Sequence, residues 1–125
     1  MSGLRIMVVE DDVVIALLFS EVLEGMGHKV CAIESTQSAA VLAAARCKPE
    51  LLIVDAQLRE GSGVDAVDEI QLTGLVPHLF VTGNTLKVQA LKPNAVVIQK
   101  PFYEADLARG IERALDLAAA SRPLS

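Results

Sequence analysis

The chain has 125 residues, the size of one ordinary domain, and 52% of them are hydrophobic, which is enough to build a core. With 16 acidic residues against 11 basic ones, its net charge of −5 opposes binding to nucleic acid, which is itself a polyanion. No apolar run approaches membrane-spanning length and the N-terminus lacks a secretory signal, so we expect a cytoplasmic protein with no nucleic-acid or membrane partner.

Apolar runs of strand length alternate with amphipathic helical stretches, which predicts repeated βα units around a parallel sheet. The runs are rich in Val, Ile and Leu, as strands buried on both faces require, and they cover residues 4–9, 29–33, 51–54, 79–81 and 95–98. A first helix follows the first strand, with a hydrophobic stripe that ends at Met26 and with Gly27 to close it. Further helices are predicted over residues 36–46, 64–72 and 104–119, whereas the alternation in residues 84–91 does not clearly indicate a helix.

Charged side chains stand at the carboxyl ends of three predicted strands. Glu10 and Asp11 follow the first strand, Asp55 follows the third, and Lys100 ends the fifth. Because parallel strands point the same way, these groups should meet in one crevice at the edge of the sheet. Adjacent carboxylates form a hard-oxygen site suited to Mg²⁺, and a lysine supplies a point charge for phosphate.

Each of these residues also has a simpler interpretation. Acidic residues favour the start of a helix, so Asp11 or Asp12 could cap the first one. Asp55 could form a turn and Lys100 could lie on the surface. A carboxylate at the mouth of a buried strand is costly without partners, however. A metal ion held by Glu10 and Asp11 would supply that partner and orient Asp55 as a nucleophile toward phosphorus.

Two features of the last strands fit the same crevice. After the fourth strand, Thr82 offers a hydroxyl, and Gly83 lets a backbone N–H approach a phosphoryl oxygen. Proline follows Lys100, and X-Pro bonds adopt the cis form far more readily than others, so a cis Lys100-Pro101 bond is a way to fix the aim of the lysine.

The two cysteines, Cys31 and Cys47, lie in apolar stretches without the spacing of a Cys-x-x-Cys motif or a nearby histidine cluster. This context favours packed core residues over a disulfide or a metal site.

Taken together, these residues resemble the receiver domain of bacterial two-component response regulators, over essentially the whole chain. The matching stretches occur in the order of the family, namely Val8-Val9-Glu10-Asp11, Leu52-Ile53-Val54-Asp55, Val81-Thr82-Gly83 and Lys100-Pro101-Phe102. The family fold is an α/β, flavodoxin-like, doubly wound sheet of five parallel strands in the order 2-1-3-4-5. We therefore expect a receiver domain over residues 1–121 and a short tail at 122–125, with no output domain.

The resemblance implies a phosphoprotein switch in a two-component phosphorelay. Asp55 would accept a phosphoryl group from a sensor histidine kinase or a phosphotransfer protein, and Lys100 and Thr82 would contact the phosphoryl oxygens. Mg²⁺, or Mn²⁺ in its place, would be held by the carboxylates of Glu10, Asp11 and Asp55 and the backbone carbonyl of Gln57. Backbone N–H groups of Gly83 and Gln57 would also face the phosphoryl group. The domain would gain and lose its own phosphoryl group and would otherwise not be an enzyme.

The chain departs from the family pattern near the fourth and fifth strands. Val97 stands three residues before the lysine, where many receivers carry a Tyr or Phe whose rotamer changes on phosphorylation. Residues 77–83 partly resemble a subgroup that lacks this aromatic and carries a Pro-Phe-x-Phe-Ala-Thr-Gly run, although His78 and Val81 break the pattern. The subgroup is associated with kinases of the HWE or related class. The downstream target would be a protein, of unknown identity, that binds the face formed after Thr82.

Two other classes compete with a phosphorylated receiver. A pseudo-receiver would keep the fold and bind a partner without phosphorylation, but such a module needs no complete set of acids, threonine and lysine. A Mg²⁺-dependent phosphatase of the haloacid dehalogenase type would need an Asp-x-Asp nucleophile after the first strand. Glu10-Asp11-Asp12-Val13 does not provide that pattern.

Overall fold

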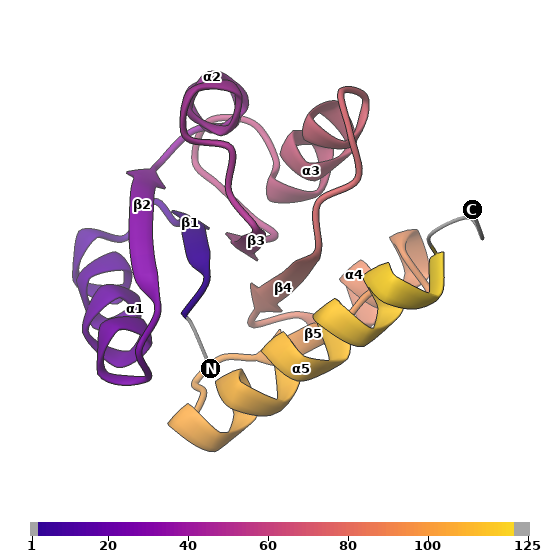
Figure 1. The fold of residues 1–125 in the computed structure, drawn as a ribbon. Coiled ribbons are helices and arrows are strands. Elements are labelled where there is room, and N and C mark those ends of the chain that lie inside the picture. Colours follow the sequence, from indigo (N-terminus) through magenta and orange to yellow (C-terminus); the bar gives the residue numbers. More distant parts are fainter. Residues whose placement is uncertain (1–2, 122–125) are drawn as a thin grey trace.

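A computed structural model describes residues 3–121, in which strands and helices alternate from end to end (Figure 1). The strands are β1 (Arg5–Val9), β2 (Lys29–Glu34), β3 (Leu51–Asp55), β4 (His78–Thr82) and β5 (Val97–Gln99). The helices are α1 (Val13–Gly25), α2 (Gln37–Cys47), α3 (Gly63–Gln71), α4 (Thr85–Leu91) and α5 (Glu104–Ser121). The predicted tail at 122–125 lies outside the described residues.

The strands form one parallel sheet in the order β2-β1-β3-β4-β5, which confirms the predicted fold class. The order places β1 and β3 side by side, with Val9 of β1 opposite Val54 of β3. The residues that follow these two strands therefore come out at the same edge of the sheet, as the sequence predicts.

Helices cover both faces of the sheet, because successive strand side chains point to opposite sides. In β1, Ile6 and Val8 enter a core shared with α1 and α5, whereas Met7 and Val9 enter a core shared with α2 and α3. Figure 1 shows α1 and α5 on one side of the strands and α2 and α3 on the other. None of the helices within residues 3–121 is both long and apolar enough to cross a membrane.

The sequence did not clearly indicate α4, yet residues 85–91 form a helix. The side chain of Asn84 caps it by accepting a hydrogen bond of 3.1 Å from the N–H of Lys87. Val88 is the one buried residue of this helix, so its sequence carries no hydrophobic stripe of the kind that identifies a longer amphipathic helix.

Candidate functional site

Asp55 is the last residue of β3 and is only 8% exposed. One carboxylate oxygen, Oδ2, lies 2.9 Å from Nζ of Lys100, and the other, Oδ1, accepts a hydrogen bond of 2.9 Å from the N–H of Gln57. The chain returns close to this point at Gly63, where a Cβ atom would lie 1.9 Å from the backbone oxygen of Asp55. Glycine is therefore required for α3 to begin directly against the end of β3.

Glu10, directly after β1, is 2% exposed and lies on the other side of the same lysine. Its Oε1 atom is 2.8 Å from Nζ of Lys100, and its Oε2 atom accepts a hydrogen bond of 3.1 Å from the N–H of Asp12. Lys100 thus joins two buried carboxylates that are 45 residues apart in the sequence. Its peptide bond to Pro101 is cis, as the sequence suggests, and its own N–H donates to the carbonyl of Thr82 at 2.9 Å.

Burial and charge act against each other in this cluster. Burial raises the pKa of Glu10 to about 7, although the hydrogen bonds from Lys100 and from the N–H of Asp12 lower it. Burial alone would lower the pKa of Lys100, but hydrogen bonds to Glu10 and Asp55 outweigh it, and that pKa lies above its usual value. The lysine therefore stays protonated near neutral pH, while the charge on Glu10 depends on any further cation nearby.

Asp11 completes the acidic side of the site. Carboxylate oxygens of Glu10, Asp11 and Asp55 all lie within 4.8 Å of one another, close enough to hold one metal ion together. Oxygen ligands in this number and spacing suit a hard divalent cation such as Mg²⁺. Asp12 has the structural role that the sequence left open, because its Oδ1 atom accepts hydrogen bonds from the N–H groups of Val14 and Ile15 and caps α1.

The remaining predicted residues border this cluster. Thr82 is the last residue of β4 and is fully buried, and its hydroxyl oxygen accepts a hydrogen bond of 3.0 Å from the N–H of Asn84. Val81, which precedes Thr82 in β4, pairs with Asp55 of β3 in the sheet. Thr82 therefore lies one residue further along β4 than the position opposite Asp55. Gly83 follows with open space where a side chain would be, and Gln57 lies in the loop after β3.

Arg59 is a site residue that the sequence did not identify. Its N–H donates to Oδ2 of Asp11 at 2.8 Å, and its guanidinium Nε lies 3.8 Å from the same oxygen, with the side chain 81% exposed. The only feature of the sequence that could have pointed to Arg59 is its position shortly after Asp55. A second missed feature is the outer face of α1, next to the acidic residues, where four apolar side chains are exposed: Val13, Val14, Leu17 and Leu18.

Comparison with known proteins agrees with this geometry. The family model of the response regulator receiver domain matches residues 6–112. The phyllosphere-induced regulator PhyR of Methylorubrum extorquens is 36% identical over 116 residues, which cover 89% of this chain and 43% of that protein. The transcriptional regulatory protein PdtaR of Mycobacterium tuberculosis is 29% identical over 115 residues, or 89% of this chain and 56% of that protein. The chain thus spans about half the length of these curated relatives.

Solved structures show the same relationship. The receiver domain of PhyR from Erythrobacter litoralis superimposes with a TM-score of 0.87 at 27% identity, covering 100% of this chain and 98% of that one. The anti-anti-sigma factor PhyR from Bartonella quintana superimposes with a TM-score of 0.82 at 27% identity, over 97% of this chain and 51% of that one. The match to the family model, the strand order and the cluster of acids and lysine agree, and the chain belongs to the response regulator receiver domain family.

Proposed function

We propose that this domain is a phosphoryl switch in which Asp55 accepts a phosphoryl group from a histidine kinase or a phosphotransfer protein. The observation that supports this most is the placement of Asp55, whose two carboxylate oxygens are held by Lys100 and by the N–H of Gln57. A nearly buried carboxylate held in one orientation is prepared for attack in line with a leaving group.

In the reaction, an oxygen of Asp55 attacks phosphorus, the bond from phosphorus to the donor nitrogen breaks, and its electron pair stays on the donor imidazole. Lys100 then neutralises charge on the phosphoryl oxygens, with its Nζ atom already 2.9 Å from the attacking carboxylate. Mg²⁺, or Mn²⁺ in its place, would be held by Glu10, Asp11, Asp55 and the carbonyl of Gln57, and when bound it would offset the charge of the transferring group. Beyond its own phosphorylation and dephosphorylation, we propose no enzymatic turnover.

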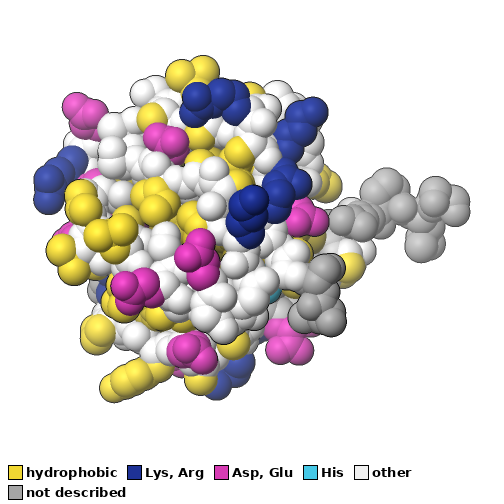
Figure 2. Space-filling view, turned by 60° about the vertical axis from the view of Figure 1, so that its left-hand side comes forward, with side chains coloured by type: hydrophobic (Ala, Val, Ile, Leu, Met, Phe, Trp, Pro, Cys, Tyr) yellow, Lys and Arg dark blue, Asp and Glu magenta, His cyan; other side chains and the backbone are white. Residues whose placement is uncertain are grey.

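The exposed apolar face of α1 supports a protein as the donor. Val13, Val14, Leu17 and Leu18 form this face, and Val14 is 76% exposed. Figure 2 shows hydrophobic side chains gathered among acidic ones on the side of the molecule that carries α1. The helix begins directly after the acidic residues, so a donor protein that packs on this face brings its phosphohistidine to Asp55.

A path for the readout begins at Thr82. Its hydroxyl oxygen accepts from the N–H of Asn84, and the side chain of Asn84 in turn caps α4 through Lys87. If the side chain of Thr82 rotates to donate its hydroxyl hydrogen to a phosphoryl oxygen, and the oxygen moves out of reach of the N–H of Asn84, the first turn of α4 is free to move without an aromatic switch on β5. At that position Val97 pairs with the fully buried Phe80. We propose that a target protein recognises the resulting change around α4 and β5.

The test is the intact mass of the protein after incubation with acetyl phosphate and Mg²⁺. We expect a phosphoryl adduct on the wild type that is lost in Asp55→Asn and with EDTA. A purified histidine kinase of the HWE class serves as a second donor. If neither donor labels the wild type, the phosphoryl switch is wrong and a phosphorylation-independent binding module replaces it.

A second experiment tests the donor-docking face. Leu17→Gln should lower the rate of labelling by the kinase about tenfold, because central apolar contacts dominate protein interfaces. Labelling by acetyl phosphate should not change. Leu42→Gln is the matched control, since Leu42 is at least as exposed as Leu17 and lies on α2, which covers the opposite face of the sheet. Equal effects of both variants would contradict docking on α1.

A further inference from the structure

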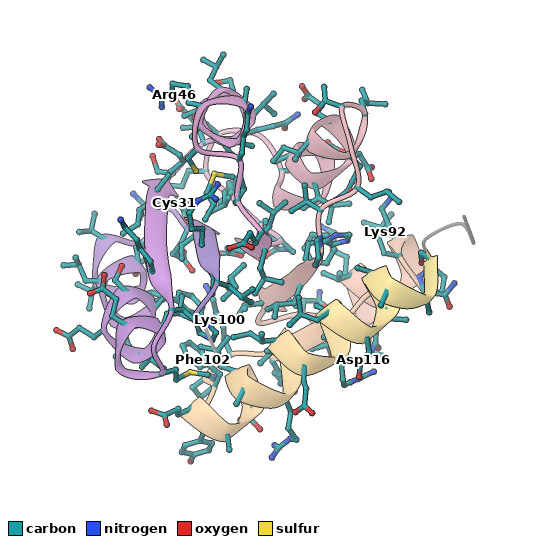
Figure 3. All side chains as sticks on the ribbon, viewed as in Figure 1. Cys31, Arg46, Lys92, Lys100, Phe102 and Asp116 are labelled. Carbon is teal, nitrogen blue, oxygen red and sulfur yellow. The ribbon has the colours of Figure 1, made fainter. Side chains whose placement is uncertain are left out.

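Outside the acidic site, the structure brings the two cysteines of the chain together. Cys31 lies on β2 and Cys47 is the last residue of α2, and their Sγ atoms are 2.7 Å apart. Figure 3 shows sulfur atoms beside the Cys31 label, next to α2. Both thiols are free and half-buried against the core beneath α2. The two sulfur atoms are therefore separated by little more than the length of a disulfide bond, which is about 2.05 Å.

The local structure fixes both side chains in these positions. Alanines form the inner face of α2, with Ala40, Ala43 and Ala44 buried, so the helix packs closely on the sheet. The helix ends directly after Cys47, because Lys48 adopts a left-handed conformation with φ of 47°. The guanidinium of Arg5 on β1 also donates to the carbonyl oxygens of Cys47 and Lys48. The end of α2 is thus held against the strands at the point where the thiols meet.

We propose that Cys31 and Cys47 form a reversible intramolecular disulfide when the protein meets a hydroperoxide. In the first step, a thiolate attacks the peroxide oxygen, the O–O bond breaks, and a sulfenic acid and hydroxide (or an alkoxide) form. In the second step, the other thiol attacks the sulfenic sulfur, and water leaves as the S–S bond forms. Two thiols are oxidised, one peroxide is reduced, and a dithiol reverses the reaction.

The surroundings indicate which sulfur reacts first. Burial and the neighbouring thiol of Cys47 together raise the pKa of Cys31 to about 12, so Cys31 is rarely a thiolate near neutral pH. We therefore assign the resolving role to Cys31 and the first oxidation to Cys47, whose Sγ atom lies within contact distance. Disulfides inside cells are mostly transient and redox-sensing, which fits a reversible bridge better than a permanent one.

The experiment treats the reduced protein with hydrogen peroxide and then denatures it in N-ethylmaleimide before intact-mass analysis. We expect two maleimide adducts before treatment, and after it a monomer that has lost two hydrogen atoms and takes up no maleimide. Dithiothreitol should restore both adducts. In Cys31→Ser the sulfenic acid of Cys47 should accumulate and be captured by dimedone, whereas Cys47→Ser should react more slowly.

A stability measurement separates a bridge that fits the fold from one that distorts it. Closing a loop of this length should raise the Tm of the oxidised protein by roughly 10 °C over the reduced form. The proposal is overturned if both thiols still take up maleimide after a treatment that oxidises Cys47 in Cys31→Ser. It is also overturned if the oxidised product is a disulfide-linked dimer or has a lower Tm. None of these outcomes depends on Asp55, so the phosphoryl switch is tested separately.

Discussion

At the carboxyl edge of the sheet, two buried carboxylates share a lysine, whereas between β2 and α2 two half-buried thiols face each other. Burial raises the pKa of one member of each pair, Glu10 to about 7 and Cys31 to about 12. At the acidic site, hydrogen bonds from Lys100 and a backbone N–H oppose the rise, whereas the thiol of Cys47 adds to it. The acidic site can hold charged carboxylates, whereas the thiol pair favours the neutral form of Cys31. The difference is that the acidic site supplies hydrogen-bond donors to its carboxylates.

The largest expected effect comes from removing the donor that the carboxylates share. In Lys100→Met, Glu10 and Asp55 would face each other without a buried cation, and breaking such a pair by removing one partner costs about 3 kcal/mol. We expect the free energy of unfolding at neutral pH, measured with urea and EDTA, to fall by this amount. Phosphoryl labelling by acetyl phosphate should also fall sharply.

The matched control for that variant is Lys92→Met. Lys92 also forms an ion pair with a carboxylate, that of Asp68 at 2.7 Å, but both side chains are exposed. Figure 3 shows Lys92 well away from Lys100. An exposed pair contributes less than about 1 kcal/mol, so this variant should keep nearly all of its stability. Similar losses in the two variants would mean that burial at the acidic site is not what makes Lys100 important.

The pH dependence of stability should show a smaller effect at the same site. The pKa of Glu10 is about 7 in the folded protein against the ordinary value of 4.5 for an exposed glutamate, so between these values the folded state binds more protons than the unfolded chain. Stability contributed by the protonated form is therefore lost as the pH rises through this window. Relative to Glu10→Gln, the metal-free wild type should lose about 2 kcal/mol between about pH 5 and pH 7.

Urea unfolding in EDTA at a series of pH values measures this difference directly. The variant removes the titrating carboxyl group, so only the difference between the two curves reports on Glu10. Parallel curves over this range would show that the pKa of Glu10 is not raised, and that Lys100 and the N–H of Asp12 compensate its burial fully.

The sequence predicted the fold and the acidic cluster well, because both rest on local patterns. Val, Ile and Leu runs mark strands buried on both faces, and parallel strands bring Glu10, Asp55 and Lys100 to one edge. The helix α4 was not clear in the sequence, since a short helix with one buried residue has no periodic stripe. The contact between Cys31 and Cys47 could not be predicted either, because it depends on how closely α2 packs on β2.

The position of Arg59 is another feature that only the structure shows. Its replacement should give the smallest of the predicted effects, a change in the affinity for Mg²⁺. Its guanidinium lies 3.8 Å from Asp11 and adds a positive charge beside the carboxylates that would hold Mg²⁺. Because the side chain is largely exposed, solvent and salt weaken this repulsion. We expect Arg59→Gln to bind Mg²⁺ about threefold more tightly in calorimetric titrations, a change of about 0.6 kcal/mol, which lies within the range for exposed charge pairs.

Arg46→Gln is the control for net charge, because Arg46 is exposed in the last turn of α2 and its replacement removes one positive charge away from the acidic cluster. If both variants bind Mg²⁺ more tightly to the same degree, the overall charge of the protein sets the affinity. If only Arg59→Gln does, the local ion pair sets it. The backbone N–H of residue 59 remains in the variant, so the hydrogen bond that orients Asp11 is kept. A gain confined to Arg59→Gln would then show that the positive charge of this side chain, and not its backbone contact with Asp11, opposes the binding of Mg²⁺ at the acidic site.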